Sequence, residues 1–94
     1  MTEPLKPSDA KALIVSILDT GRVEFSAHAL KEMEDDGITI PEAFGVLRGG
    51  VVEPAELVRG SWRYRVRRAI TYVVVAFREE DAMVVVTAWR RQQQ

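Results

Sequence analysis

Apart from a short strand candidate at residues 22–25, the spacing of apolar residues in this 94-residue chain changes at the pair Gly49-Gly50. Before the pair, apolar residues recur at the interval of amphipathic helices; after it, they form the alternating or continuous runs typical of strands. We therefore expect an α+β fold, with two to three N-terminal helices packed on one face of a C-terminal antiparallel sheet. The expected helices span residues 8–19, 27–35 and 39–47, and the expected strands span residues 22–25, 51–58, 62–68, 70–78 and 83–89.

Residues that favour helix ends mark the expected boundaries. Ser8 and Ser26 can each cap the helix that follows them, because a hydroxyl oxygen accepts a hydrogen bond from a free N–H of the first turn. Thr39 and Glu42 have the spacing of a capping box at the third helix. Gly37 is expected to end the second helix, as glycine often does.

The chain length fits one domain. Pro54 cannot donate a backbone hydrogen bond, so the strand around it is expected at a sheet edge. The expected organisation is a single domain over residues 1–94, with a flexible arm 1–6, a mainly helical part 7–48, antiparallel strands 51–90 and a tail 91–94.

Composition excludes several kinds of site. The chain has no cysteine and one histidine, so disulfides, thiolate metal sites and a histidine-rich zinc site within the chain are excluded. The acidic residues of 32–36 indicate a solvated helix end, because no second acidic cluster is expected beside them. We expect no metal and no cofactor.

The longest apolar run, Tyr72 to Phe77, is too short to span a bilayer, and no signal pattern opens the chain. We therefore expect a cytoplasmic protein with no membrane contact.

The net charge of −1 conceals an uneven distribution. Residues 1–47 carry four basic and nine acidic side chains, whereas residues 48–94 carry nine arginines and five acidic side chains. The C-terminal half therefore has room for a local basic surface.

The segment 59–68 contains five arginines and no acidic residue. Within it Arg63, Arg65 and Arg67 alternate with apolar residues, and a strand turns successive side chains to opposite faces, so these arginines are expected on one face. Guanidinium groups bind phosphate bidentately, which indicates a polyanion such as RNA as partner. The alternative is a solvated face whose arginines pair with acids such as Glu32 or Glu34.

His28 and Tyr72 are candidates for further chemistry. His28 falls in the first turn of an expected helix, and a histidine can transfer protons near neutral pH. Its alternative role is a local hydrogen bond that fixes the strand–helix junction. Tyr72 can offer a hydroxyl group to a phosphate, whereas Trp62 and Tyr64 are expected in the core because they oppose the arginines.

Two sequence motifs resemble the DUF4258 family. The first is Phe25-Ser-Ala-His28-Ala-Leu-Lys-Glu-Met33, followed by Gly37-Ile38-Thr39 and a short helix. The second is a basic strand followed by hydrophobic strands that close on Val85-Val86-Thr87-Ala88-Trp89. The resemblance covers roughly residues 22–90. Asp36 stands where the resemblance leads us to expect an arginine.

That family looks similar to toxins of the RelE, MqsR and BrnT type, which belong to bacterial toxin–antitoxin pairs. The resemblance implies helices on one side of an antiparallel sheet and a metal-independent RNA endonuclease that binds messenger RNA and an antitoxin protein. It places the family's histidine on His28 and its basic strand on Arg63 to Arg67. On this reading His28 is an acid or base, Arg63, Arg65 and Arg67 bind phosphate, and Tyr72 assists. Further RNA contacts are expected from Lys31, Arg59, Arg68 and Arg90.

Two alternatives use the same sheet. One is a binding module without catalysis, which would take RNA or an acidic antitoxin segment, with strand addition at the edge formed by residues 51–58. The other is a homodimer that pairs these edges.

Overall fold

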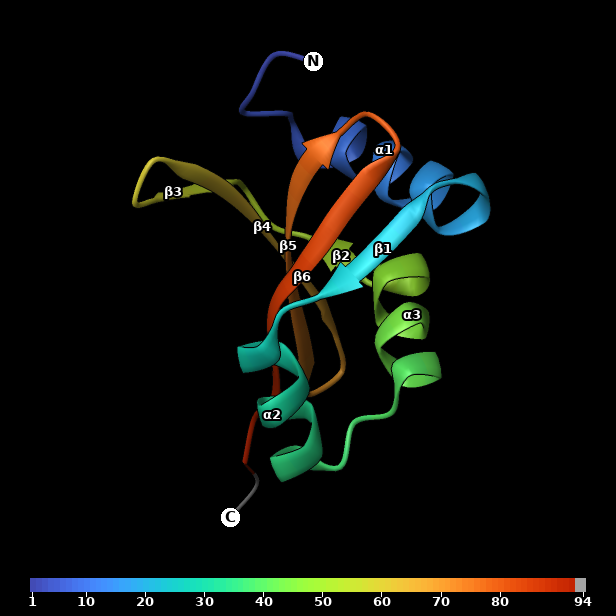
Figure 1. The fold of residues 1–94 in the computed structure, drawn as a ribbon, viewed down its shortest axis with the longest axis vertical. Coiled ribbons are helices and arrows are strands. Elements are labelled where there is room, and N and C mark those ends of the chain that lie inside the picture. Colours follow the sequence, from blue (N-terminus) through green and yellow to red (C-terminus); the bar gives the residue numbers. More distant parts are fainter. Residues whose placement is uncertain (93–94) are drawn as a thin grey trace.

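The computed structural model describes residues 1–92, and its three helices and six strands follow the expected order (Figure 1). The helices are α1 (Pro7–Thr20), α2 (Ala27–Asp36) and α3 (Ile40–Gly49). The strands are β1 (Arg22–Phe25), β2 (Val51–Val52), β3 (Glu56–Val58), β4 (Ser61–Arg68), β5 (Thr71–Glu79) and β6 (Ala82–Arg90). The α+β class is therefore confirmed.

The six strands form one sheet in the order β1-β6-β5-β4-β2, with β3 also paired to β4. Strands β4, β5 and β6 are antiparallel neighbours, as expected. The expected C-terminal antiparallel sheet is confirmed, and β1, for which the sequence specified no partner, extends it by pairing with β6 in parallel. No hairpin joins these two strands, so their relative direction is not restricted by a turn. The expected weak strand 51–58 is divided at Pro54 into β2 and β3, both along β4.

Helices α1 and α3 cover one face of the sheet, and the apolar core lies between them and the strands (Figure 1). Helix α2 packs along β6. Burial of these side chains supplies the main favourable free energy of folding. The largest fully buried side chains are Ile14, Ile17, Leu47, Tyr64, Val66, Val73, Val75, Met83 and Val85.

Most of the expected helix ends are confirmed. The Ser26 hydroxyl accepts a hydrogen bond from the backbone N–H of Ala29, and Thr39 and Glu42 form the capping box. Gly37 adopts a φ of 68° just after α2, a left-handed conformation that suits glycine. Ser8 does not cap α1, because the helix begins one residue earlier at Pro7. Proline favours the first helical position, where its missing N–H costs no hydrogen bond.

The N-terminal arm, residues 1–6, contacts the sheet at Tyr64 of β4. The buried Tyr64 hydroxyl accepts a hydrogen bond from the Leu5 N–H (2.9 Å) and donates one to the Glu3 carboxylate (2.8 Å). Burial of this hydroxyl raises the pKa of Tyr64 to about 12.

No helix within residues 1–92 is long and apolar enough to cross a membrane.

Candidate functional site

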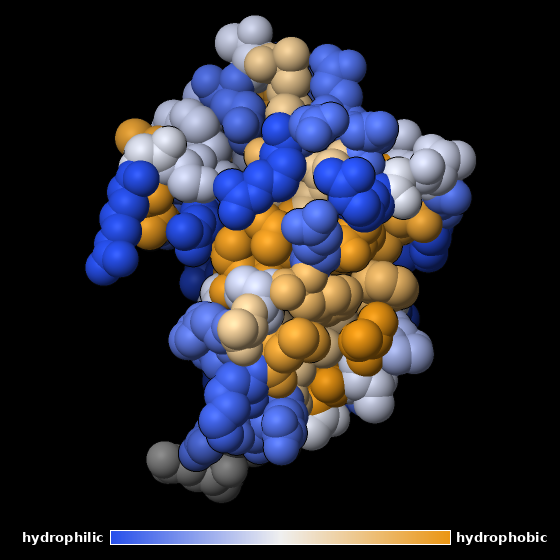
Figure 2. Space-filling view, viewed as in Figure 1, coloured by the Kyte–Doolittle hydropathy of each residue, from blue (hydrophilic) through white to orange (hydrophobic). Residues whose placement is uncertain are grey.

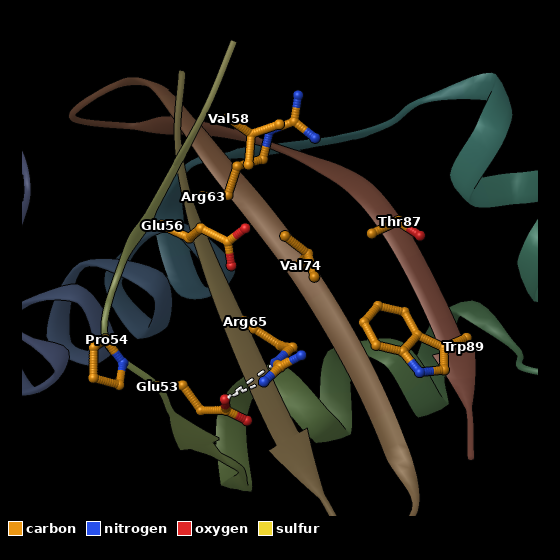
Figure 3. A pocket seen from close by; sticks show the side chains of 9 residues that line it. All are labelled: Glu53, Pro54, Glu56, Val58, Arg63, Arg65, Val74, Thr87 and Trp89. Atoms are coloured by element: carbon orange, nitrogen blue, oxygen red, sulfur yellow. Dashed lines mark hydrogen bonds and ion pairs between the residues drawn. The ribbon is translucent and has the colours of Figure 1, made fainter. Parts of the chain in front are cut away.

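The three alternating arginines of β4 lie on the sheet face opposite α1 and α3, as predicted. Tyr64 and Val66 between them are fully buried on the helix side. Trp62 is partly buried and packs against the same core, which confirms its expected side. Figure 3 looks onto the opposite face, with α1 and α3 behind the sheet. We call it the open face, and it carries Arg63, Arg65, Arg67, Tyr72, Val74, Thr87 and Trp89.

An acidic side chain from outside β4 pairs with two of these arginines. Glu53, just after β2, accepts two hydrogen bonds from Arg65, at 2.6 and 3.1 Å, and lies 3.7 Å from Arg67. These bonds raise the pKa of the Arg65 guanidinium above its usual value. The sequence pattern suggested Glu32 or Glu34 as partners; the structure shows Glu53 instead. Coverage by a carboxylate lowers the positive charge that Arg65 and Arg67 offer to another anion.

Arg63 differs from the other two arginines because it forms no ion pair with any residue of 1–92. Its Nε atom is buried and has no hydrogen-bond partner within the same residues. A guanidinium group has five N–H donors, so Arg63 keeps most of its donor capacity available. It is therefore the arginine of the open face best placed to receive an added anion.

Two aromatic rings extend the open face from β5 to β6. Tyr72 and Trp89 stack with their ring centroids 5.0 Å apart and an angle of 8° between their planes. The Arg65 guanidinium carbon lies 5.6 Å from the centroid of the Tyr72 ring, within the range of a cation–π contact. The arrangement gives Tyr72 the position near Arg65 that the sequence alone could not specify.

A hollow of about 220 Å³ lies between the arginines and Trp89 (Figure 3). Its walls differ in character: Glu53 and Glu56 lie on the β2–β3 side, the two arginines project from β4, and Trp89 lies on the β6 side. The residues that line it are Glu53, Pro54, Glu56, Val58, Arg63, Arg65, Val74, Thr87 and Trp89. Figure 2, from another direction, shows an apolar area over the middle of the molecule, bordered by hydrophilic side chains.

His28 lies on α2 and does not line the hollow. Its side chain is 70% exposed, and its Nε2 atom lies 3.1 Å from the Glu32 carboxylate one turn later. The same Glu32 oxygen accepts a hydrogen bond from the Thr87 hydroxyl, and Thr87 does line the hollow. His28 is thus connected to the open face through Glu32 and Thr87.

The remaining sequence candidates are spread over the molecule. Lys31 pairs with Asp35 on the exposed side of α2 at 2.9 Å. Arg59 occupies the turn between β3 and β4 with a φ of 51°, at the tip of a hairpin that projects from the body (Figure 1). Arg68 points to the helix side, where its guanidinium lies 3.4 Å from the Gly45 carbonyl oxygen.

Arg90 also lies on the helix side and holds the α2–α3 connection. Its guanidinium donates to the carbonyl oxygens of Asp36 (3.1 Å) and Gly37 (3.3 Å) and pairs with Glu42. Its backbone N–H donates to the Asp36 carboxylate at 2.8 Å. Asp36, at the position where an arginine was expected, therefore joins α2 to the last strand. The pKa of Glu42 is lowered, first by hydrogen bonds from Thr39 and then by Arg90.

Sequence reasoning missed Glu53, Glu56 and Thr87 as site residues, and it named Trp89 only as the last residue of the second family motif. Glu53 and Glu56 lie at the two ends of the irregular break around Pro54, and no periodicity indicates how this segment pairs with β4. The alternation along β6 is interrupted by a register shift opposite Val74 and Val75, so the faces of Thr87 and Trp89 could not be counted from β5. Residues 1–92 contain no cluster of three or more His, Cys, Asp or Glu side chains that could hold a metal.

Comparison with known proteins gives one match. No curated protein and no solved structure matches this chain. The family model described as a domain of unknown function, DUF4258, matches residues 25–90, which include α2, the whole β4–β6 meander and every residue of the hollow. The chain therefore belongs to the DUF4258 family.

Proposed function

We propose that this protein is a toxin-like RNA endonuclease that needs no metal and binds single-stranded RNA on its open face. The observation that carries the proposal is the gathering of Arg63, Arg65 and Arg67 beside the stacked pair Tyr72 and Trp89. Arginines bind the phosphates of a nucleic acid, and exposed aromatic rings stack with unpaired bases. A sheet face that combines the two is typical of proteins that bind single strands.

Cleavage of RNA without a metal uses the 2′-hydroxyl group as the nucleophile. Its oxygen attacks the adjacent phosphorus while its proton passes to a base, and the bond to the leaving 5′-oxygen breaks as that oxygen takes a proton. Arginines stabilise the additional negative charge at the phosphate. In this chain we assign proton transfer to His28 and charge stabilisation to Arg63 and Arg65, with Tyr72 as a further hydroxyl near the phosphate.

The contact between His28 and Glu32 supports this assignment. A carboxylate beside an imidazole accepts a hydrogen bond from the ring N–H and so orients the ring. Because Glu32 also accepts a hydrogen bond from Thr87, the histidine is held at the edge of the open face. Arg68 and Arg90 are left out of the site, because their side chains lie on the helix side.

The test is cleavage of a labelled single-stranded RNA in the presence of EDTA. The protein should release fragments that end in a cyclic phosphate, and His28→Ala should cleave about 10²–10⁴ times more slowly, the usual loss for a proton-transfer group. Leu30→Ala, an exposed neighbour on α2, should cleave at the original rate. His28→Ala that cleaves at full rate, with its circular dichroism unchanged, would remove His28 from the mechanism.

A second function, a binding module without catalysis, is favoured by the Glu53 contacts. A carboxylate already lies on Arg65 and Arg67, as an acidic segment of an antitoxin would. This module would bind RNA or the acidic protein segment without cutting RNA. Binding without any cleavage by the purified protein selects it, and growth arrest on expression that Arg65→Ala relieves selects the endonuclease.

A further inference from the structure

The hollow on the open face has a side wall of carboxylates, which accept hydrogen bonds, next to the arginines of β4, which donate them. Glu56 pairs with Arg63 in the β3–β4 register and lines the hollow from β3. In Figure 3 its carboxylate points across the hollow, toward Val74. Glu56 is exposed and has no hydrogen bond or ion pair with any residue of 1–92, so both carboxylate oxygens are available as acceptors.

The lining of the hollow away from Glu56 is largely apolar and suits a flat apolar ligand. Val74 and Val58 provide aliphatic contacts, and Trp89 brings an indole ring from β6. Unpaired RNA bases are flat, and they stack on or pack against side chains of this kind. Arg63, whose guanidinium forms no ion pair with any residue of 1–92, stands at the upper end of the hollow in Figure 3. A phosphate next to the bound base would reach its guanidinium group.

Resting on the RNA binding proposed above, we infer that this hollow is a base-selective subsite for guanine in single-stranded RNA. Guanine has two adjacent N–H donor groups, N1–H and N2–H, on its Watson–Crick edge, and a carboxylate accepts both at once. Adenine and cytosine offer an amino group beside an acceptor, and uracil offers one N–H between two acceptors. The acceptor pair of Glu56 repels the ring nitrogen acceptors of adenine and cytosine and the carbonyl oxygens of uracil, so guanine is the best match.

The experiment measures binding apart from cleavage. RNA strands of about eight nucleotides, a length within the site size of single-strand binders, carry 2′-O-methyl groups that remove the nucleophile. Four strands differ only at the centre, where an otherwise uridine sequence has guanine, adenine, cytosine or uracil. The full-length protein should bind the guanine strand about 5- to 10-fold more tightly than the uridine strand, near the lower end expected for a bidentate base contact.

Glu56→Gln and Glu56→Ala should bring this ratio to within about twofold, because neither side chain offers two acceptors to the guanine edge. Glu24→Gln makes the same change of charge on β1, where Glu24 pairs with Arg22 at 3.1 Å, and should keep the ratio. Equal binding of all four strands by the unmodified protein, or a ratio that survives in both Glu56 variants, overturns the guanine subsite while the proposed RNA binding stands. Failure to bind any strand overturns both.

Discussion

Replacement of Glu53 by glutamine should increase the affinity of the open face for RNA. Glu53 accepts hydrogen bonds from Arg65 and lies 3.7 Å from Arg67, so a phosphate that binds these arginines must displace it. A partly exposed ion pair contributes about 0.2–1 kcal/mol. Two such pairs correspond to about 0.4–2 kcal/mol, which is about 2- to 30-fold in the dissociation constant.

The salt dependence of binding provides a second measurement on the same variant. Each phosphate newly bound to an arginine changes the slope of log K against log salt by about −0.7 for a single strand. Release of Arg65 and Arg67 in Glu53→Gln should therefore make the slope steeper by about 0.7–1.4. Fluorescence anisotropy with a labelled single-stranded RNA between low and moderate salt measures both quantities.

The matched control is Glu24→Gln, which removes the same charge from an exposed pair at the opposite edge of the sheet. It should leave affinity and slope close to those of the unmodified protein. If Glu53→Gln binds RNA no more tightly than Glu24→Gln does, phosphate does not compete with Glu53, and Arg65 and Arg67 do not bind the RNA phosphates.

Two further predictions concern stability. Tyr64→Phe removes the hydrogen bonds to Leu5 and Glu3 and should lower the free energy of unfolding by about 1–2 kcal/mol in urea denaturation. Because the folded pKa of Tyr64 is raised to about 12, its hydroxyl group stabilises the fold fully below a pH of about 10 and loses this contribution as the pH rises through about 12. The difference in unfolding free energy between the unmodified protein and Tyr64→Phe should therefore shrink over that window. A difference that stays constant would contradict this prediction. Leu47→Ala, at a fully buried position, should lower the free energy of unfolding by about 2–5 kcal/mol. Leu57→Ala, at a side chain that is 55% exposed, should lower it by less than about 0.5 kcal/mol. Equal losses of unfolding free energy in the two variants would show that Leu47 is not in the core.

Local patterns predicted the parts of the fold that depend on neighbouring residues. Strict alternation in β4 was enough to place Arg63, Arg65 and Arg67 on one face and Tyr64 in the core. The capping box at Thr39 follows from side chains three positions apart. These features need no knowledge of distant contacts, because one strand or one helical turn contains all of the interacting groups.

Features that depend on pairing between distant segments could not be predicted. Glu53 reaches Arg65 only because β2 pairs with β4, and β2, which ends directly before Glu53, is two residues long. Arg90 and Asp36 are 54 positions apart, so their contact leaves no periodic signal. The run of basic residues also made Arg68 look equivalent to its neighbours, whereas alternation places it on the helix side.

The parallel pairing of β1 with β6 has a consequence for the order in which this chain can fold. Ser26, directly after β1, donates its backbone N–H to the Val85 carbonyl oxygen and its hydroxyl group to the carbonyl oxygen of Val86, 60 positions away. During synthesis from the N-terminus, β1 and α2 emerge long before the strand that gives them their neighbours. Contacts of such large sequence separation slow folding. The early segment that carries His28 therefore gains its final environment only after β6 has been made, so an incomplete chain has no assembled site.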